Sequence, residues 1–207
     1  MQIQASVKNI IFDFGGVILN IDYKLTEAAF TKLGVKNFAE IYSQAIQNNL
    51  FDQLEKGLIT PTDFRKEVRK FITREVSDLQ IDEAWNSMLL DLPDERVALL
   101  SDLKKKYQLF LLSNTNEIHF NTFSNYMQNK FKCDLFSDLF IKAYFSHKVK
   151  MRKPDAEIFE LVLKEQNLHR EETLFIDDSI QHIESAKKLG LQTLFLVKGK
   201  TILDLVI

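Results

Sequence analysis

Acidic and small polar residues stand at the ends of three apolar runs in this sequence. Asp13 closes the run NIIFD, Ser113 closes QLFLLS, and the pair Asp177-Asp178 closes TLFIDD. Short runs of bulky apolar residues indicate buried parallel strands, and open parallel sheets bind ligands beyond the carboxyl ends of their strands. Carboxylates that converge there repel one another unless a cation lies among them. Because these ligands are oxygens, with no His/Cys cluster, they indicate Mg²⁺ rather than Zn²⁺.

A lysine in the sequence MRKPD could complete such a site. Lys153 taken alone would be interpreted as a solvated surface lysine, but the carboxylates elsewhere in the chain reverse that interpretation. A positive charge beside carboxylates and Mg²⁺ suits a dianionic substrate, and phosphate fits best. Pro154 is expected in the first turn of the next helix, where proline is tolerated, so that it fixes the loop that carries Lys153.

The histidines and the single cysteine give no comparable signal. None of His119, His147, His169 and His182 has metal-ligand spacing to another histidine, so we expect surface or structural roles for them. Cys133 has no histidine neighbour and is expected to be an ordinary thiol, and a single cysteine excludes an intramolecular disulfide.

The elements that must position these residues alternate along the chain. Strands are predicted over 9–14, 108–113, 173–177 and 192–197, and helices over 95–106, 156–166 and 180–189. Gly190 is expected to end the last helix. Strands that alternate with helices predict an α/β fold, with a Rossmann-like parallel sheet covered by helices on both faces.

The stretch from about Tyr23 to Asp91 lacks strand patterns and predicts an inserted helical cap domain. Helices are expected over 25–33, 38–47, 64–71 and 83–90. Thr60-Pro61 has the pattern of a helix start. We therefore predict a core domain of residues 1–18 and 92–207 and a cap domain of residues 19–91.

Composition excludes several classes of protein. The 207 residues (24.1 kDa) are 45% hydrophobic and 27% charged, which excludes disordered and fibrous chains. The net charge of −2 gives no sign of nucleic-acid binding. No apolar run is long enough to span a membrane, and the run Ile10 to Leu19 is a poor signal peptide. We expect a soluble cytoplasmic protein with a small-molecule partner. The sequence does not set the oligomeric state, and a monomer is compatible with it.

Four motifs together resemble the haloacid dehalogenase superfamily. They are IIFDFGGV, LFLLSNTN, MRKPD and LFIDDS, in the superfamily's order and spanning nearly the whole chain. The helical insertion after the first motif resembles the superfamily's small helical cap. The stretches SNTNEIH, MRKPDAEIF and FIDDSIQHIESAKKLG further resemble sugar-phosphate phosphatases that act on α-glucose 1-phosphate.

The resemblance implies catalytic roles for three residues. Asp13 would be the nucleophile that takes the phosphoryl group, and as an ionised carboxylate it needs no general base. Ser113 and Asn114, with neighbouring backbone N–H groups, would hold the phosphoryl oxygens. Lys153 would offset charge between nucleophile and phosphate as they approach.

The resemblance also implies a Mg²⁺ site. Asp13 and Asp178 would be direct ligands, and Gly15 would bind through its backbone carbonyl. Asp177 would be either a second carboxylate ligand or a holder of Lys153 and bound water.

Gly15 is a departure from the superfamily's phosphatases, which usually carry an acid/base aspartate at that position. General acid–base catalysis by such an aspartate typically raises the reaction rate by about 10² to 10⁴-fold. A first interpretation is a leaving group that needs less help, as in a hexose 1-phosphate. A second is a substitute acid, with Asp22 nearest, although we favour Asp22 as the N-cap of the helix near Tyr23. A third is a phosphate-binding regulatory module that has lost turnover, against which the retained Asp13, Lys153 and aspartate pair argue. A dehalogenase is disfavoured, because dehalogenases have no need of Mg²⁺ and the aspartate pair.

Substrate identity is expected to depend on the cap. Phe51, Asp52, Glu55 and Lys56 precede Gly57 at a helix–loop junction, where caps of this superfamily reach the substrate. Each of the four taken singly would be interpreted as part of a solvated helix end.

Overall fold

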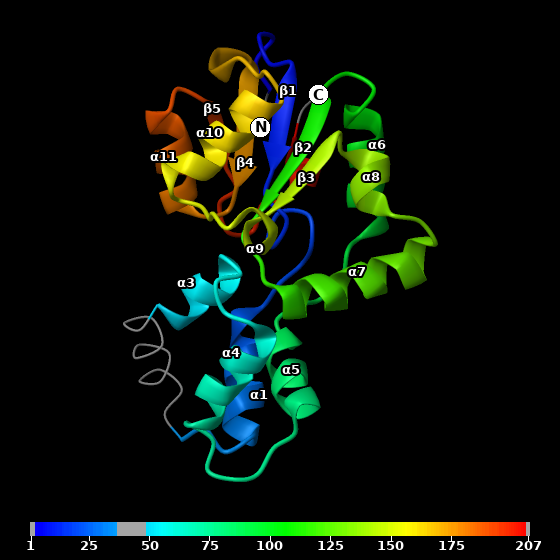
Figure 1. Ribbon diagram of the computed structural model, residues 1–207. Coiled ribbons are helices and arrows are strands. Elements are labelled where there is room, and N and C mark those ends of the chain that lie inside the picture. The colour runs from blue at the N-terminus through cyan, green and yellow to red at the C-terminus, as the bar shows by residue number, and fades with distance from the viewer. Residues whose placement is uncertain (1–2, 37–48, 206–207) are drawn as a thin grey trace.

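A five-stranded, fully parallel sheet forms the centre of the computed structural model, which describes residues 3–36 and 49–205 (Figure 1). The strand order is β3-β2-β1-β4-β5. The strands are β1 (Asn9–Phe12), β2 (Gln108–Ser113), β3 (Lys142–Phe145), β4 (Thr173–Asp177) and β5 (Gln192–Phe195). Phe12 pairs with Leu111 on one side and Ile176 on the other, so β1, β2 and β4 end at one level.

Alternate residues of the strands face opposite helical layers. Ile10 and Phe12 belong to a hydrophobic cluster with one helical layer, while Ile11 packs against the other. The first layer is α6 (Asp94–Leu103), α7 (Glu117–Phe131), α8 (Leu135–Leu139) and the 3₁₀ turn η2 (Ile202–Asp204). The second is α10 (Ala156–Glu165) and α11 (Ile180–Lys188). The expected Rossmann-like α/β fold is confirmed. Two short elements complete the core domain: α9 (Ser146–Val149) and η1 (Arg170–Glu172).

Sequence patterns located most of the core elements. The four predicted strands and three predicted helices are present, with Gly190 beyond α11 at φ 86°. The prediction for Pro154 was wrong: α10 begins at Ala156 with Asp155 as its N-cap, so Pro154 precedes the helix, and its peptide bond with Lys153 is cis. β3 and the 15-residue helix α7 were not predicted.

A separate helical layer forms between β1 and α6, and it has its own hydrophobic centre. Its helices are α1 (Tyr23–Lys32), α3 (Leu50–Glu55), α4 (Pro61–Arg69) and α5 (Asp78–Asn86). Thr60 caps α4 as expected, accepting from the Asp63 N–H at 3.1 Å. The helix expected over 83–90 begins five residues earlier, because Ser77 and Gln80 form a capping box there. The helix expected over 38–47 falls outside the described residues.

The two segments that join this layer to the sheet run side by side. The Asn20 N–H donates to the Asp91 carbonyl at 2.9 Å, and the Leu90 N–H donates to the Asn20 carbonyl at 3.0 Å. We therefore propose the division at 18/19 and 91/92, and we call residues 19–91 the cap. α7 lies between cap and sheet in Figure 1, and its Ile118 packs into the hydrophobic centre of the cap. Among the described residues, no helix is both long and apolar enough to cross a membrane.

Candidate active site

The residues singled out at strand ends lie together at the carboxyl edge of three adjacent strands. Asp13 follows β1, Ser113 is the last residue of β2, and Asp177 is the last residue of β4. All three are buried, with exposed fractions of 7%, 2% and 0%. The register of the parallel strands therefore produces the convergence expected from the sequence.

Lys153 is buried at the centre of this cluster. Its Nζ lies 2.6 Å from Asp13 Oδ1 and 2.7 Å from Asp177 Oδ2, and its side chain is fully buried. The interpretation of Lys153 as a solvated lysine is thus excluded. The two carboxylates therefore accept charge-assisted hydrogen bonds from one buried ammonium.

The loop that carries Lys153 is held by Asn114. The Lys153 N–H donates to Asn114 Oδ1 at 2.9 Å, and Asn114 Nδ2 donates to the Lys153 carbonyl at 2.8 Å. The side-chain amide of Asn114 is therefore engaged with the Lys153 backbone, which leaves its backbone N–H for the phosphate-binding role expected from the sequence. Ser113 has its hydroxyl 3.5 Å from the Asn114 carbonyl.

Asp177 is held from three sides. Besides Lys153, the Ser179 N–H donates to Asp177 Oδ1 at 2.7 Å, and His182 Nδ1 donates to the carboxylate at 3.0 Å. Of the two roles that the sequence left open, these contacts favour Asp177 as the holder of Lys153.

Electrostatics separates Asp13 from Asp177. Burial raises the pKa of Asp13 to about 7, although Lys153 opposes the shift. Burial would also raise the pKa of Asp177, but attraction by Lys153 and the hydrogen bond from His182 outweigh it and lower this pKa to about 2. Burial and the neighbouring Asp177 raise the pKa of Asp178 as well. The single positive charge of Lys153 therefore does not neutralise the three neighbouring carboxyl groups of Asp13, Asp177 and Asp178.

The donor set fits a divalent cation. Asp13, Asp177 and Asp178 each offer one carboxylate oxygen, and the three oxygens lie within 4.8 Å of one another. Among the described residues, no histidine or cysteine joins such a group. Hard oxygen ligands favour Mg²⁺, and a cation among the three carboxylates would relieve their mutual repulsion.

Gly16 lets Asp178 approach the loop after β1. Gly16 has φ +82°, and a Cβ built there would lie 2.2 Å from Asp178 Oδ2. Gly15 differs: its φ lies outside the left-handed region, and a Cβ there would lie 3.5 Å from Ile21. An aspartate at position 15 would therefore meet neither backbone strain nor a clash of its Cβ.

A cavity of about 570 Å³ opens from these residues toward the cap. Its core-side lining is Asp13, Phe14, Gly15, Ser113, Asn114, Thr115, His119, Phe123, Arg152, Asp178, Ser179 and His182. Its cap-side lining is Leu19, Ile21, Tyr23, Lys24, Thr26, Glu27, Phe51, Glu55, Trp85, Met88 and Leu89. Lys153 and Asp177 lie fully buried behind this surface.

The residues expected to face the substrate from the cap divide into two kinds. Phe51 and Glu55 line the cavity, whereas Asp52 and Lys56 pair with the core domain. Arg152 Nη1 lies 2.5 Å from Asp52, and Lys56 Nζ lies 2.8 Å from Asp155.

Three of the cavity residues were not predicted as functional from the sequence: Arg152, and the histidines His119 and His182, for which surface or structural roles were expected. His182 follows Asp177 by five residues and lies in the first turn of α11, and this spacing could have indicated their contact. Arg152 directly precedes Lys153 and pairs with the cap. His119 stacks on Trp85 with ring centroids 5.1 Å apart, a contact between distant segments that no local pattern shows.

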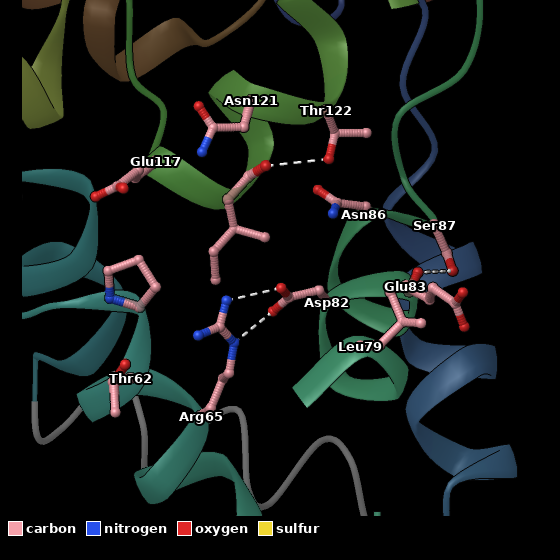
Figure 2. Close-up of a pocket in the computed structure, with 12 residues that line it drawn as sticks. Thr62, Arg65, Leu79, Asp82, Glu83, Asn86, Ser87, Glu117, Asn121 and Thr122 are labelled. Carbon is pink, nitrogen blue, oxygen red and sulfur yellow. Dashed lines mark hydrogen bonds and ion pairs between the residues drawn. The ribbon is translucent and has the colours of Figure 1, made fainter. Parts of the chain in front are cut away.

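A second cavity, of about 710 Å³, lies between the cap and α7 and includes none of the predicted site residues (Figure 2). Arg65 reaches across from α4 and pairs with both carboxylate oxygens of Asp82, at 2.8 and 2.7 Å. Because its arginine is already paired with a carboxylate, this cavity lacks the charge arrangement of the first.

A parallel sheet with an aspartate, a buried lysine and an acidic pair beyond its strand ends is typical of an enzyme of the α/β fold class that acts on anionic substrates. The chain belongs to the haloacid dehalogenase-like hydrolase family, whose model matches residues 10–196. It is 32% identical over 189 residues to D-ribitol-5-phosphate phosphatase of Bacteroides thetaiotaomicron, covering 90% of each chain.

Solved structures show the same similarity. The chain is 40% identical to a crystal structure of a family enzyme from Bacteroides thetaiotaomicron, with a TM-score of 0.85, covering 94% of this chain and 95% of that one. A structure described as its wild-type complex with magnesium and inorganic phosphate is 41% identical, with a TM-score of 0.83 and coverage of 94% and 96%. The chain also shares its fold with the L-2-haloacid dehalogenase of Xanthobacter autotrophicus. The two are 16% identical, with a TM-score of 0.62 and coverage of 92% of this chain and 77% of that one.

Proposed function

We propose that this protein is a Mg²⁺-dependent phosphatase that hydrolyses a small phosphorylated polyol or sugar through an aspartyl-phosphate intermediate. The observation that carries the proposal is the Asp13 carboxylate, held 2.6 Å from the buried Lys153 ammonium in a cavity that opens toward the cap. The similarity to a D-ribitol-5-phosphate phosphatase and to a magnesium and phosphate complex supports it.

In the first chemical step, one Asp13 oxygen attacks phosphorus and the bond from phosphorus to the leaving oxygen breaks. Lys153 donates a hydrogen bond to the Asp13 carboxylate. Its positive charge compensates the negative charge that builds up as Asp13 and the phosphoryl group approach each other. We assign the holding of the phosphoryl oxygens to Ser113 Oγ and the backbone N–H of Asn114, because the Thr115 N–H already donates to Ser146 Oγ at 2.9 Å. Water then attacks phosphorus and releases inorganic phosphate and free Asp13.

The metal would be held by Asp13, Asp178 and the backbone carbonyl of Gly15, with Asp177 beside them. When bound, Mg²⁺ neutralises phosphoryl charge and orients the substrate. Asp177 also accepts a hydrogen bond from Lys153 Nζ at 2.7 Å, which would keep Lys153 protonated and in place.

Two substrate types are supported by different observations. Similarity favours an open-chain polyol phosphate such as a pentitol 5-phosphate. Gly15 has no side chain that could protonate a leaving group, and this favours a hexose 1-phosphate as substrate. The anomeric oxygen of a hexose 1-phosphate is a better leaving group than an ordinary alcohol oxygen and depends less on protonation. The expected resemblance to α-glucose-1-phosphate phosphatases stays a prediction. The regulatory-module alternative is not favoured, since the nucleophile, the lysine and the acidic pair are all present and in contact.

The test is Mg²⁺-dependent release of inorganic phosphate from a panel that contains D-ribitol 5-phosphate, hexose 1-phosphates and hexose 6-phosphates. We expect release from at least one of them, and none after chelation of the metal. Asp13→Asn is nearly isosteric and should abolish release while the circular dichroism spectrum is unchanged. Substantial turnover by the folded Asn variant would contradict the aspartyl-phosphate mechanism, and an inactive wild type would restore the binding-module alternative.

A further inference from the structure

The proposed reaction needs a proton for its leaving oxygen, and the loop after β1 does not provide one. Gly15 has no side chain. Asp22, the nearest carboxylate along the chain, accepts from the Lys24 N–H at 3.0 Å as the N-cap of α1 and does not line the cavity. The preference for Asp22 as a helix cap is thus confirmed, and the acid must come from elsewhere.

Other titratable groups on the cavity wall are committed or badly placed. Glu27 is exposed on α1 at the cavity rim. His119 Nδ1 is 2.8 Å from Asn86, and burial lowers the pKa of its ring to about 3, so it carries no proton to give at neutral pH. His182 is bound to Asp177 and so belongs to the group that holds Lys153.

Glu55 is a carboxylate of the cap that is neither solvated nor fully paired. It ends α3, lines the cavity, and is 26% exposed. Its Oε2 lies 2.8 Å from Arg152 Nε, but outside hydrogen-bond geometry, so this buried oxygen has no hydrogen-bond donor among the described residues. An under-satisfied buried carboxylate gains most by taking up a proton.

Arg152 does not neutralise Glu55 alone, because it also pairs with Asp52. The Arg152 Nη1 lies 2.5 Å from Asp52 Oδ1, so two carboxylates share one guanidinium. Burial raises the pKa of Glu55, Asp52 raises it further, and the attraction of Arg152 only partly opposes them. Lys153 also acts on the Glu55 charge, which places this carboxylate in the electrostatic field of the Asp13 site.

We propose that Glu55, from the cap, is the general acid and base that replaces the missing side chain at Gly15; this rests on the phosphatase function proposed above. As the bond from phosphorus to the leaving oxygen breaks, the Glu55 carboxyl gives its proton to that oxygen and the alcohol departs. The Glu55 carboxylate then takes a proton from the water whose oxygen attacks the aspartyl phosphate. Phosphate leaves, and Asp13 and protonated Glu55 are restored.

Glu55→Gln tests this assignment through the leaving group. D-Ribitol 5-phosphate releases an alkoxide that must be protonated, whereas p-nitrophenyl phosphate releases a stable phenolate. Rapid-mixing measurements of the first turnover report only the transfer to Asp13, before water is needed. We expect the first-turnover release of ribitol to slow by about 10² to 10⁴-fold, the range of general acid catalysis. The p-nitrophenol burst should slow by less than about threefold.

Matched variants separate chemistry from structure. Glu27→Gln removes another carboxylate of the same cavity, and it should change both first-turnover rates by the same factor. Glu55→Asp retains a carboxyl on a shorter side chain and should recover part of the ribitol rate. An equal loss for both substrates in Glu55→Gln, or no loss in either, overturns the assignment of Glu55. If wild type with Mg²⁺ releases phosphate at no detectable rate, neither from p-nitrophenyl phosphate nor from any member of the sugar and polyol phosphate panel, the proposed function itself has failed, and the two failures are thereby distinguished.

Gly15→Asp provides a rescue in the same experiment. The position accepts a Cβ without backbone strain. In the Glu55→Gln background, an aspartate there should restore the ribitol first-turnover rate at least tenfold while the p-nitrophenol burst stays constant. A rise of both rates by one factor would show that leaving-group protonation is not what Glu55→Gln removed.

Discussion

Lys153 places one ammonium between two buried carboxylates, and this arrangement makes both activity and stability depend on it. Lys153→Ala should lower kcat by about 10² to 10³-fold, since a charge that compensates the transition state is lost. Removal of one partner from a buried ion pair also destabilises, by about 3 to 5 kcal/mol. Urea unfolding and phosphate-release kinetics measure the two effects separately.

Lys153→Arg keeps the charge and serves as the matched comparison. A planar guanidinium does not fit the place of a compact ammonium, so we expect stability to recover more than activity. Full activity in Lys153→Ala would show that the lysine does not contact the reacting groups and would remove the basis of its proposed role.

Most of the site residues that the sequence identified stand at or just after the end of an apolar run with a clear local pattern. Asp13, Ser113 and Asp178 follow apolar runs, so their meeting at one sheet edge is predictable. Arg152 and His182 were not identified, because their importance comes from partners distant in the sequence or across a loop. A local pattern carries no information about the distant partners of Arg152, whereas the spacing of His182 from Asp177 could have been used.

At the scale of elements, the loops after β1 and β4 fit together only because position 16 lacks a side chain. Gly16→Ala would place a methyl group 2.2 Å from Asp178 Oδ2 in the present geometry, at a left-handed φ that alanine disfavours. The carboxylate must move, and the Mg²⁺ concentration for half-maximal activity should rise at least tenfold. Titration of activity with Mg²⁺ measures this shift.

Gly190→Ala is the control for Gly16→Ala, because Gly190 also has a positive φ but its Cβ would meet only Arg170, at 3.8 Å. It should lower stability without altering the Mg²⁺ requirement. An unchanged Mg²⁺ requirement in Gly16→Ala would mean that Asp178 is not a ligand.

His119 joins α7 to α5 and makes that junction sensitive to acid. Burial lowers the pKa of His119 from 6.5 to about 3, so the folded state binds this proton less readily than the unfolded state. Its contribution to stability is complete above pH 6.5 and is lost as pH falls toward 3. Between pH 6.5 and pH 5 the loss is about 2 kcal/mol.

The difference between wild type and His119→Gln isolates this effect. Urea unfolding at pH 7 and at pH 5 should show a smaller acid loss in the variant, by about 2 kcal/mol. Replacement of the exposed His169 by Gln is the control and should leave the wild-type pH dependence intact. Parallel pH dependences for wild type and His119→Gln would contradict the assigned burial.

Elements were predictable where a local signal was strong. The buried central strands and the capped helices α4 and α11 have such signals. β3 has four residues at the sheet edge, beginning with an exposed lysine, so its pattern is too short to recognise. The start of α5 was missed because it depends on a capping box at Ser77 rather than on apolar periodicity.

At the scale of the whole molecule, helix α3 of the cap lies against the core segment around α9, as Figure 1 shows. Arg152 pairs with Asp52, Lys56 pairs with Asp155, and Lys150 donates to the Gly57 carbonyl. These contacts lie beside the entrance of the candidate active site and hold the cap over it. Caps and lids that close over substrate govern its access and commitment.

Lys56→Ala combined with Lys150→Ala should loosen the cap while leaving the Asp52, Arg152 and Glu55 charges and Asp13 in place. Partly exposed contacts between charged groups contribute about 0.2 to 1 kcal/mol each. The loss of two such contacts should therefore destabilise the closed state by roughly 0.4 to 2 kcal/mol, a factor of about 2 to 30 in its population. KM for the phosphorylated substrate should rise by about that factor, while kcat changes less, because the catalytic groups are intact once the cap has closed. The radius of gyration from small-angle X-ray scattering should increase. Lys70→Ala removes an ion pair within the cap, between Lys70 and Glu67, and should change neither KM nor the scattering. A double variant with wild-type KM and scattering would show that packing of α7 into the cap, rather than these contacts, sets the domain arrangement.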